Sequence, residues 1–213
     1  MVDAEDYRNY GMLNQFHAQQ LNEKAERCLR KSIALGEGRS LSFRADVTVS
    51  EASEGQLGYL LRSLGRNQEN IDKYEQAVKD EPERVYNWYG LIDAYAAEDP
   101  EKALALAKEC LVKFPGDDGL FFMCGDTCRK MEKFDEAEGY YKQAVEANPD
   151  NGSSYYNMAF MYTEMKEHEK AIWAWEQVIT LCGRLGLADE EAEMNREWPR
   201  REIAKLRAKP LLG

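Results

Sequence analysis

Cys124 and Cys128 are the residues of this chain whose type and spacing come closest to a chemical site. Residues four apart on a helix share a face, so the two thiols could hold a metal ion or form a reactive pair. A metal site needs about four ligands, however, and no second pair of ligands is near in sequence. Both positions also fit an apolar stripe, where cysteine behaves as a small hydrophobic residue. We therefore predict that both thiols are structural.

Other catalytic signals are missing from the sequence. The two histidines, His17 and His168, are far apart, and we do not expect them to share a site. No glycine-rich phosphate-binding loop, dinucleotide-binding fingerprint or metalloprotease motif occurs. These observations predict a protein without enzymatic activity, cofactor or bound metal.

The chain is acidic, with 39 Asp and Glu against 28 Lys and Arg and a formal net charge of −11. The acid excess either keeps the protein soluble or attracts a basic partner. Because an acidic surface repels phosphate groups, we expect neither nucleic acid nor an anionic membrane as a partner.

The compartment is predicted from apolar runs and cysteines. No apolar run approaches the roughly 20 residues that cross a bilayer, and the acidic N-terminus does not resemble a secretion signal. The five cysteines lack the spacing of a disulfide framework, which fits a reducing compartment. We predict a cytoplasmic protein.

A repeat runs through most of the chain. The stretch "KYEQAVKDEP" at residues 73–82 returns as "YYKQAVEANP" at residues 140–149, and "LAKECLVKFP" at 106–115 also ends in proline. Pro82, Pro115 and Pro149 are therefore 33 and 34 residues apart. This period gives four units, at residues 51–84, 85–117, 118–151 and 152–185.

Each unit is predicted to form a helical hairpin. Apolar residues recur at i, i+3, i+4 and i+7 in both halves of a unit, which is the period of a helix that buries one stripe. Small residues such as Gly125 and Ala137 fit places where two helices cross closely. Proline then ends the second helix.

These residues resemble the tetratricopeptide repeat, whose 34-residue unit carries an aromatic residue, Leu-Gly and Tyr in its first half and Ala, an aromatic residue, Ala and Pro in its second. The resemblance covers residues 51–185 in four consecutive copies. Ile92 and Asn70 depart from the family's small residues, and the second unit lacks one residue in its turn. The resemblance implies an all-α fold, a right-handed superhelix of helical hairpins.

The segments before the four units are interpreted in the same frame. Residues 1–36 are predicted to form a degenerate repeat. Its family spacings are held by Met12, Phe16, Ala25, Leu29 and Ser32. Residues 37–50 are an insertion, either a functional loop or simple slack in a surface connection.

Residues 186–213 are predicted to cap the last repeat, because a solenoid needs a polar outer face at its end. Within this segment we expect Pro199 to begin a second helix, since proline is favoured at the first helical position. We also expect the segment to cover Trp173, which should point away from its own hairpin.

The resemblance also implies a binding face. In the family, five positions of each first helix line a concave groove that holds a segment of a partner protein. Carried over to this sequence, the candidate contacts are Tyr59, Arg62, Tyr86, Tyr89, Asp93, Phe122, Asp126, Arg129, Tyr156 and Phe160. Exposed Tyr and Phe are concentrated where proteins bind each other. The aromatic candidates either bind a partner or only pack against neighbouring helices.

One subgroup of the family holds the C-terminal carboxylate of heat-shock chaperones with a clamp of Lys, Asn and Arg. One register of this chain places Gly55, Tyr59, Gly90, Gly119 and Met123 at the clamp positions. The next register places Tyr89, Asp93, Met123, Ser153 and Asn157 there. Because neither contains a cation, we do not expect a carboxylate clamp.

The sequence therefore predicts a module that binds a peptide or helical segment of another protein in an aromatic-lined groove. The alternative is a structural subunit that self-associates, as a homo-oligomer, or docks inside a larger assembly.

Overall fold

The structure is a computed structural model. It describes the backbone of residues 19–34, 40–41, 44–184 and 189–208, and the side chains of residues 19–34, 54–182 and 196–208. Met12 and Phe16 of the predicted N-terminal repeat, and His17, lie outside the described residues. The chain forms two compact units, Met1–Gln76 and Ala77–Gly213, and the boundary falls within helix α3 (Asn67–Asp80). The two units are described separately.

The first unit contains a helix over residues 19–34, two strands and a helical hairpin. Strand β1 (Ser40–Leu41) pairs antiparallel with β2 (Arg44–Thr48), so the insertion at 37–50 includes regular structure that the sequence did not predict. Helix α2 (Val49–Ser63) follows β2 directly and leads to α3. In the helix over residues 19–34, Ala25 is exposed, although the family pattern would place it in a close helix contact.

The α2–α3 hairpin of the first unit has a small apolar core of Leu57, Leu61, Ile71 and Tyr74. Asn70, which stands where the family has alanine, is also buried. It lies against Gly58, where an added Cβ would be 3.0 Å from the Asn70 amide nitrogen. Glycine at this position thus leaves room for the larger side chain.

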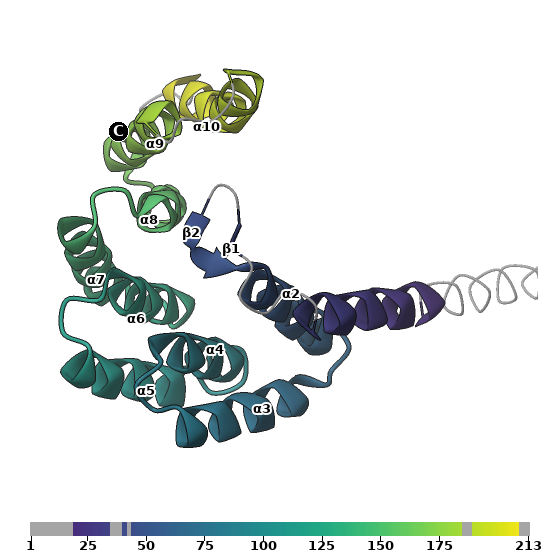
Figure 1. The fold of residues 1–213 in the computed structure, drawn as a ribbon. Helices are drawn as coiled ribbons and strands as arrows, with labels where there is room; N and C mark the ends of the chain where they lie inside the picture. The colour runs from purple at the N-terminus through teal and green to yellow at the C-terminus, as the bar shows by residue number, and fades with distance from the viewer. Residues whose placement is uncertain (1–18, 35–39, 42–43, 185–188, 209–213) are drawn as a thin grey trace, which may run out of the picture. The chain divides into compact units, whose positions relative to one another are not determined.

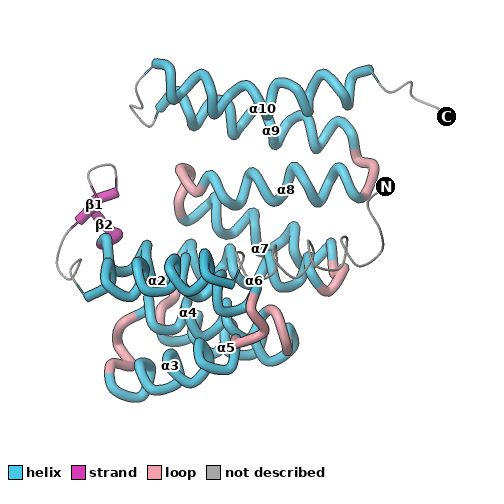
Figure 2. The backbone as a smooth tube through the Cα atoms, turned by 90° about the vertical axis from the view of Figure 1, so that its right-hand side faces the viewer, coloured by secondary structure: helices cyan, strands magenta, loops and turns pink. Residues whose placement is uncertain are grey.

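The second unit is a stack of helical hairpins. Its helices are α4 (Val85–Ala96), α5 (Pro100–Lys113), α6 (Asp118–Lys130), α7 (Phe134–Ala147), α8 (Gly152–Glu164), α9 (His168–Arg184) and α10 (Asp189–Ala208). Each helix contacts the next in the chain, and α4 contacts α6 as α6 contacts α8. In Figure 1, α4, α6 and α8 form one side of this stack and α5, α7 and α9 the other; Figure 2 shows α8, α9 and α10 as successive layers. This is the arrangement of a helical solenoid.

Side-chain caps start three of these helices. The side chains of Asp99, Asp117 and Asn151 each accept a hydrogen bond from the backbone N–H group three residues further on, at 2.9, 2.8 and 3.0 Å. Such caps satisfy N–H groups that have no partner inside the helix. They fix where α5, α6 and α8 begin.

Three of the four hairpin turns share one backbone conformation. Gly65, Glu132 and Lys166 occupy the same repeat position and have φ values of 70°, 59° and 61°. A residue in the left-handed backbone conformation commonly ends a helix and lets the chain reverse direction. The second repeat, which is one residue shorter, has no positive φ between its described helices α4 and α5.

The core of the second unit lies between the two sides of the stack. Tyr141 of α7 is fully buried against Gly125 of α6, where an added Cβ would lie 2.7 Å from the ring. The buried alanines Ala103, Ala107, Ala137 and Ala144 occur on the second helices. Small side chains therefore occupy the helix contacts of the repeats, and large rings fill the space beside them.

The C-terminal helix corrects two predictions. Helix α10 continues through Pro199, so proline does not begin a new helix there. Pro199 is buried, as are Ile203 and Leu206, and the three residues share one apolar stripe of α10. Trp173 is 44% exposed and is therefore not covered as expected. Helix α10 instead packs on the side of α9 that carries Trp175, whose ring centroid is 4.9 Å from that of Trp198.

Candidate partner-binding surface

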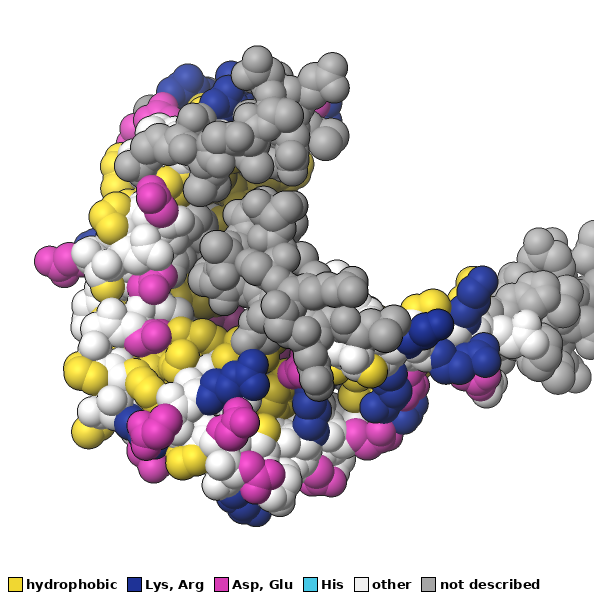
Figure 3. Space-filling view, in the orientation of Figure 1, with side chains coloured by type: hydrophobic (Ala, Val, Ile, Leu, Met, Phe, Trp, Pro, Cys, Tyr) yellow, Lys and Arg dark blue, Asp and Glu magenta, His cyan; other side chains and the backbone are white. Residues whose placement is uncertain are grey.

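The ten candidate residues are divided between the units. Tyr59 and Arg62 lie on α2 in the first unit, where Tyr59 is 71% exposed. The other eight lie on α4, α6 and α8 in the second unit. In Figure 3, hydrophobic side chains gather over α4 and α6, with both acidic and basic side chains beside them.

Tyr89 on α4 is tied to the start of α6. Its hydroxyl donates a hydrogen bond of 2.6 Å to Asp117, the residue that caps α6. Its ring lies over Gly119, where an added Cβ would be 2.5 Å from the Tyr89 hydroxyl oxygen. Burial, and then the hydrogen bond to the Asp117 carboxylate, raise the pKa of Tyr89 far above its ordinary value. Tyr89 therefore joins two repeats and is only partly exposed.

Phe122 and Tyr86 are also half-buried. The Phe122 ring centroid lies 6.2 Å from that of the buried Tyr141, so it packs on the core. The Arg84 guanidinium lies 5.7 Å from the centre of the Tyr86 ring, in the range of a cation–π contact. These rings offer part of their surface to solvent and part to the protein.

The charged candidates on α6 belong to an ion-pair cluster. Asp126 pairs with Lys130 at 2.8 Å and with Arg129 at 3.3 Å. Arg129 also reaches Glu164 of α8, at 3.6 Å. Two carboxylates thus balance two cations, and the cluster connects the first helices of neighbouring repeats. The remaining acidic candidate, Asp93, lies half-exposed on α4.

Tyr156 and Phe160 are part of an aromatic cluster with Trp175 and Trp198. Their ring centroids lie 4.9 Å apart, and Trp198 lies 5.6 Å from Tyr156 and 5.4 Å from Phe160. Trp175 meets both rings edge-on, at 5.2 and 5.3 Å. Trp175 is buried, whereas Tyr156 is 41% and Trp198 38% exposed. The cluster therefore has a buried base and an exposed aromatic surface.

Trp198 was not among the residues predicted from sequence, because it lies outside the repeats. The sequence predicted only that the segment containing it, residues 186–213, caps the last repeat. A useful signal would have been the two aromatic residues at successive groove positions of the last repeat, Tyr156 and Phe160, because a following helix can pack on them.

The two thiols predicted to be structural lie in the core of the second unit. Cys124 and Cys128 are completely buried on α6, and Cys110 of α5 is 1% exposed. Burial raises the pKa of Cys124 to about 12, so its thiol stays protonated and weakly nucleophilic at neutral pH. All five cysteines are free.

Two further kinds of site were sought in the part of the chain that the structure describes. No three His, Cys, Asp or Glu side chains within it come together in a way that could bind a metal ion. None of its helices combines the length and the apolar character that crossing a membrane requires.

Comparison with family models finds the tetratricopeptide repeat three times. The matches cover residues 56–118, 119–151 and 140–172, so together they span residues 56–172, more than half of the chain. Their range includes the helices from α2 to the first part of α9.

The chain is also similar to a curated relative and to solved structures. The Hsp70-Hsp90 organising protein of Plasmodium falciparum is 40% identical over 48 residues, which are 22% of this chain and 8% of that protein. A thermophilic TPR protein of Thermus thermophilus has 19% identity and a TM-score of 0.51, over 74% of this chain and 95% of that chain, which shows a shared fold. A crystal structure of MamA has 23% identity and a TM-score of 0.48, over 70% of this chain and 92% of that chain.

Proposed function

Because the chain belongs to the tetratricopeptide repeat family, we propose that this protein–protein interaction module binds a peptide or helical segment of another protein on the side formed by α4, α6 and α8. The proposed role is non-enzymatic. It requires no cofactor, because partner recognition by a preformed helical surface involves no covalent step.

The observation that carries this proposal is the exposed surface of the aromatic cluster. Tyr156 and Trp198 are large rings in direct contact, and more than a third of each is exposed. Buried aromatic residues at the centre of an interface usually carry most of its binding energy. The underlying Trp175 and Phe160 hold both rings in place, so a partner would meet a preorganised surface at little cost in side-chain entropy.

Tyr89 and Phe122 have a different role in the proposal. Both are half-buried against the protein, so they form a firm floor beside which a partner lies rather than free anchors. The Asp126, Arg129 and Glu164 cluster would supply the polar rim and exclude a partner that buries an unpaired charge there.

A chaperone C-terminal carboxylate is not the proposed ligand. Gly119, at one clamp position, faces the Tyr89 ring, and an added Cβ would lie 2.5 Å from its hydroxyl oxygen. A lysine at this place would therefore have to displace the Tyr89 ring, and the other clamp positions also lack their cations.

Self-association remains the second candidate, because one aromatic pair lies outside the proposed surface. Trp173 of α9 is 44% exposed and meets Tyr155 of α8 edge-on at 6.0 Å. Such a pair is suited to an interface between copies or to docking in an assembly. Light scattering across a range of concentrations separates the candidates, since a monomer at all concentrations would contradict self-association.

The two aromatic surfaces give a matched test of the proposal. Tyr156→Ala and Trp173→Ala each remove one ring of nearly equal exposure, 41% and 44%. Affinity capture from a lysate of the source cell, followed by peptide identification, should recover a partner with the wild type and with Trp173→Ala but not with Tyr156→Ala. Circular dichroism confirms that each variant is folded. Capture that survives Tyr156→Ala but fails with Trp173→Ala would place the binding surface elsewhere.

A further inference from the structure

The helix over residues 19–34 is attached to the first unit by an interface with little apolar content. None of its described side chains is buried. The half-buried ones are Asn22, Glu26, Leu29, Ser32 and Ile33. Their spacing places Glu26, Leu29 and Ile33 on one face of the helix, so a carboxylate lies in the middle of the contact stripe. Only two large apolar residues of this helix contribute to its docking.

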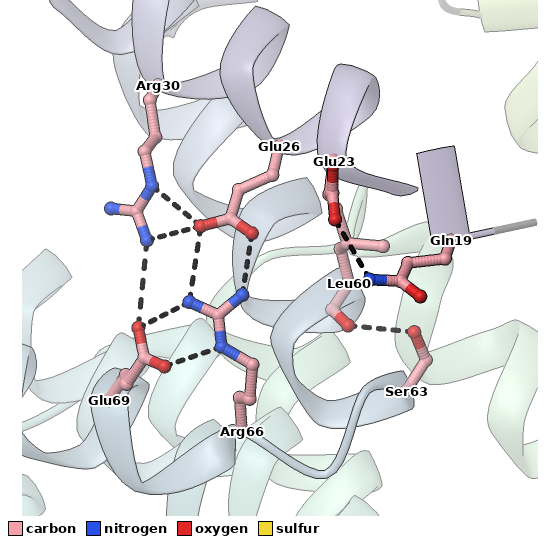
Figure 4. A network of polar contacts seen from close by, with 8 residues as sticks. All are labelled: Gln19, Glu23, Glu26, Arg30, Leu60, Ser63, Arg66 and Glu69. Carbon is pink, nitrogen blue, oxygen red and sulfur yellow. Dashed lines mark hydrogen bonds and ion pairs between the residues drawn. The ribbon is translucent and has the colours of Figure 1, made fainter. Parts of the chain in front are cut away.

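A ring of four charges joins this helix to the α2–α3 hairpin (Figure 4). Glu26 pairs with Arg66, in the turn between α2 and α3, at 2.7 Å and with Arg30 of its own helix at 2.8 Å. Glu69 of α3 pairs with Arg66 at 2.6 Å and lies 3.8 Å from Arg30. The charges therefore alternate in sign around the ring, and two of its four links cross between the helix and the hairpin.

The central carboxylate is well shielded. The Glu26 side chain is 15% exposed, and it accepts hydrogen bonds from both guanidinium groups. The hydrogen bond from Arg66, followed by that from Arg30, lowers the pKa of Glu26. The two arginines keep the Glu26 carboxylate ionised. If Glu26 loses its charge, Arg66 and Arg30 each lose one ion pair.

Apolar contacts and the ion-pair ring both hold the helix on the hairpin, and their relative strengths decide which of them keeps it docked. Half-burying Leu29 and Ile33 stabilises docking only modestly, because part of each side chain stays in contact with water. A detached helix of this length is marginal in water, so detachment also unfolds it. We propose that residues 19–34 form an ionically latched arm, held on the α2–α3 hairpin by the Glu26–Arg66–Glu69–Arg30 ring and detaching from a hairpin that stays folded when the ring is broken or screened.

The consequence is a surface that depends on ionic conditions. With the arm docked, Leu29 and Ile33 are half-buried. With the arm detached, their side chains become accessible. The inference concerns the first unit alone and does not rest on the partner-binding surface of the second.

Amide hydrogen exchange of the full chain tests the latch. Glu26→Gln keeps the shape of the side chain but removes its charge. Glu23→Gln makes the same change on the exposed side of the same helix, where Glu23 accepts a hydrogen bond of 3.1 Å from Gln19. We expect Glu26→Gln to speed amide exchange of residues 23–34 by about threefold or more, which is the effect expected when partly shielded ion pairs are lost. Exchange in α3 and in the Glu23→Gln variant should match the wild type.

Salt gives a second arm of the same experiment. Raising sodium chloride to about 1 M shortens the screening length to about 3 Å and should speed exchange in residues 23–34 of the wild type, but add little in Glu26→Gln. Equal exchange in Glu26→Gln and Glu23→Gln, or equal acceleration of residues 23–34 and α3, would overturn the proposal. The second result would mean that helix and hairpin open as one cooperative unit.

Charge reversal keeps the test decisive if Glu26→Gln unfolds the first unit. Glu26→Arg with Arg30→Glu puts like charges across both inter-element links, and the arm should exchange fastest in this variant. Adding Arg66→Glu and Glu69→Arg restores the alternation with every sign inverted, and should restore protection. Failure of the fourfold variant to recover protection above the double variant would contradict a latch made of charge pairing.

Discussion

Gly125 is the position where the packing of the repeats can be tested most directly. A Cβ built there would lie 2.7 Å from two carbon atoms of the Tyr141 ring and 3.1 Å from a third. Non-bonded carbon atoms prefer about 3.5–4.0 Å, so Gly125→Ala forces the fully buried ring to move by about 1 Å. Overpacking of this kind costs about 1–3 kcal/mol.

Helix propensity offsets part of the overpacking cost of Gly125→Ala. Alanine is favoured over glycine in a helix interior by about 1 kcal/mol, so the net expectation for Gly125→Ala is a destabilisation of up to about 2 kcal/mol. Gly139, on the paired helix α7, is the matched control, because a Cβ there meets nothing within 4 Å. Gly139→Ala should therefore stabilise the protein by about 0.5–1 kcal/mol.

Denaturant unfolding of both variants measures the difference. A double-mutant cycle with Tyr141→Leu isolates the clash: in that background Gly125→Ala should lose its penalty, with a coupling energy of about 1–3 kcal/mol. If Gly125→Ala raises stability as much as Gly139→Ala does, the close contact between α6 and α7 is wrong, and with it the assignment of Gly125 to the helix crossing.

Three further outcomes are expected. Asp117→Ala should cost about 2–3 kcal/mol, more than the roughly 1 kcal/mol of Asp99→Ala, because Asp117 accepts a hydrogen bond from the Tyr89 hydroxyl as well as capping its helix; urea midpoints compare them. Burial, as the largest cause, raises the pKa of the Tyr89 hydroxyl. The neutral hydroxyl therefore stabilises the fold fully below about pH 10, the pKa of an unfolded tyrosine, and this stabilisation is lost as the pH rises through the folded-state pKa. Tyr89→Phe should reduce that loss in thermal melts at alkaline pH. In native thiol labelling, exposed Cys28 should react promptly and Cys124 only on unfolding.

The family and the helical solenoid could be predicted from sequence because their signals are local and repeated. The prolines at 82, 115 and 149 set the period, and the small residues show where helices cross. An error in one unit is corrected by the others, as with the short second repeat. Family models and structure both confirm this level of the prediction.

Features that occur once were predicted less well. Pro199 was expected to start a helix, because proline destabilises a helix interior. That prediction left out the apolar stripe that Pro199 shares with Ile203 and Leu206. The β1–β2 hairpin lies in a stretch without a repeated partner, so no periodic signal indicated it. Trp173 and Trp175 are two residues apart and thus face nearly opposite sides of a helix; sequence alone did not show which side α10 would occupy.

The candidate surface shows the same limit at the level of single residues. Tyr89 and Tyr156 share one repeat position, and the sequence predicts equal exposure for them. The structure differs because each ring leans on the next first helix: Tyr89 meets Gly119 and the Asp117 acceptor at the start of α6, whereas Tyr156 meets Trp198 of α10.

The neighbouring helix therefore decides what each ring can do. A glycine and a carboxylate allow Tyr89 to sink against α6 and satisfy its hydroxyl, which removes most of its apolar surface from contact with a partner. A tryptophan side chain cannot accept a hydrogen bond from the Tyr156 hydroxyl, and it is too large to lie beneath the Tyr156 ring. Tyr156 and Trp198 therefore lie side by side, and both stay partly exposed. The aromatic surface proposed for binding thus arises at the last repeat, where α10 presents a large ring instead of the small residue that α6 presents to Tyr89.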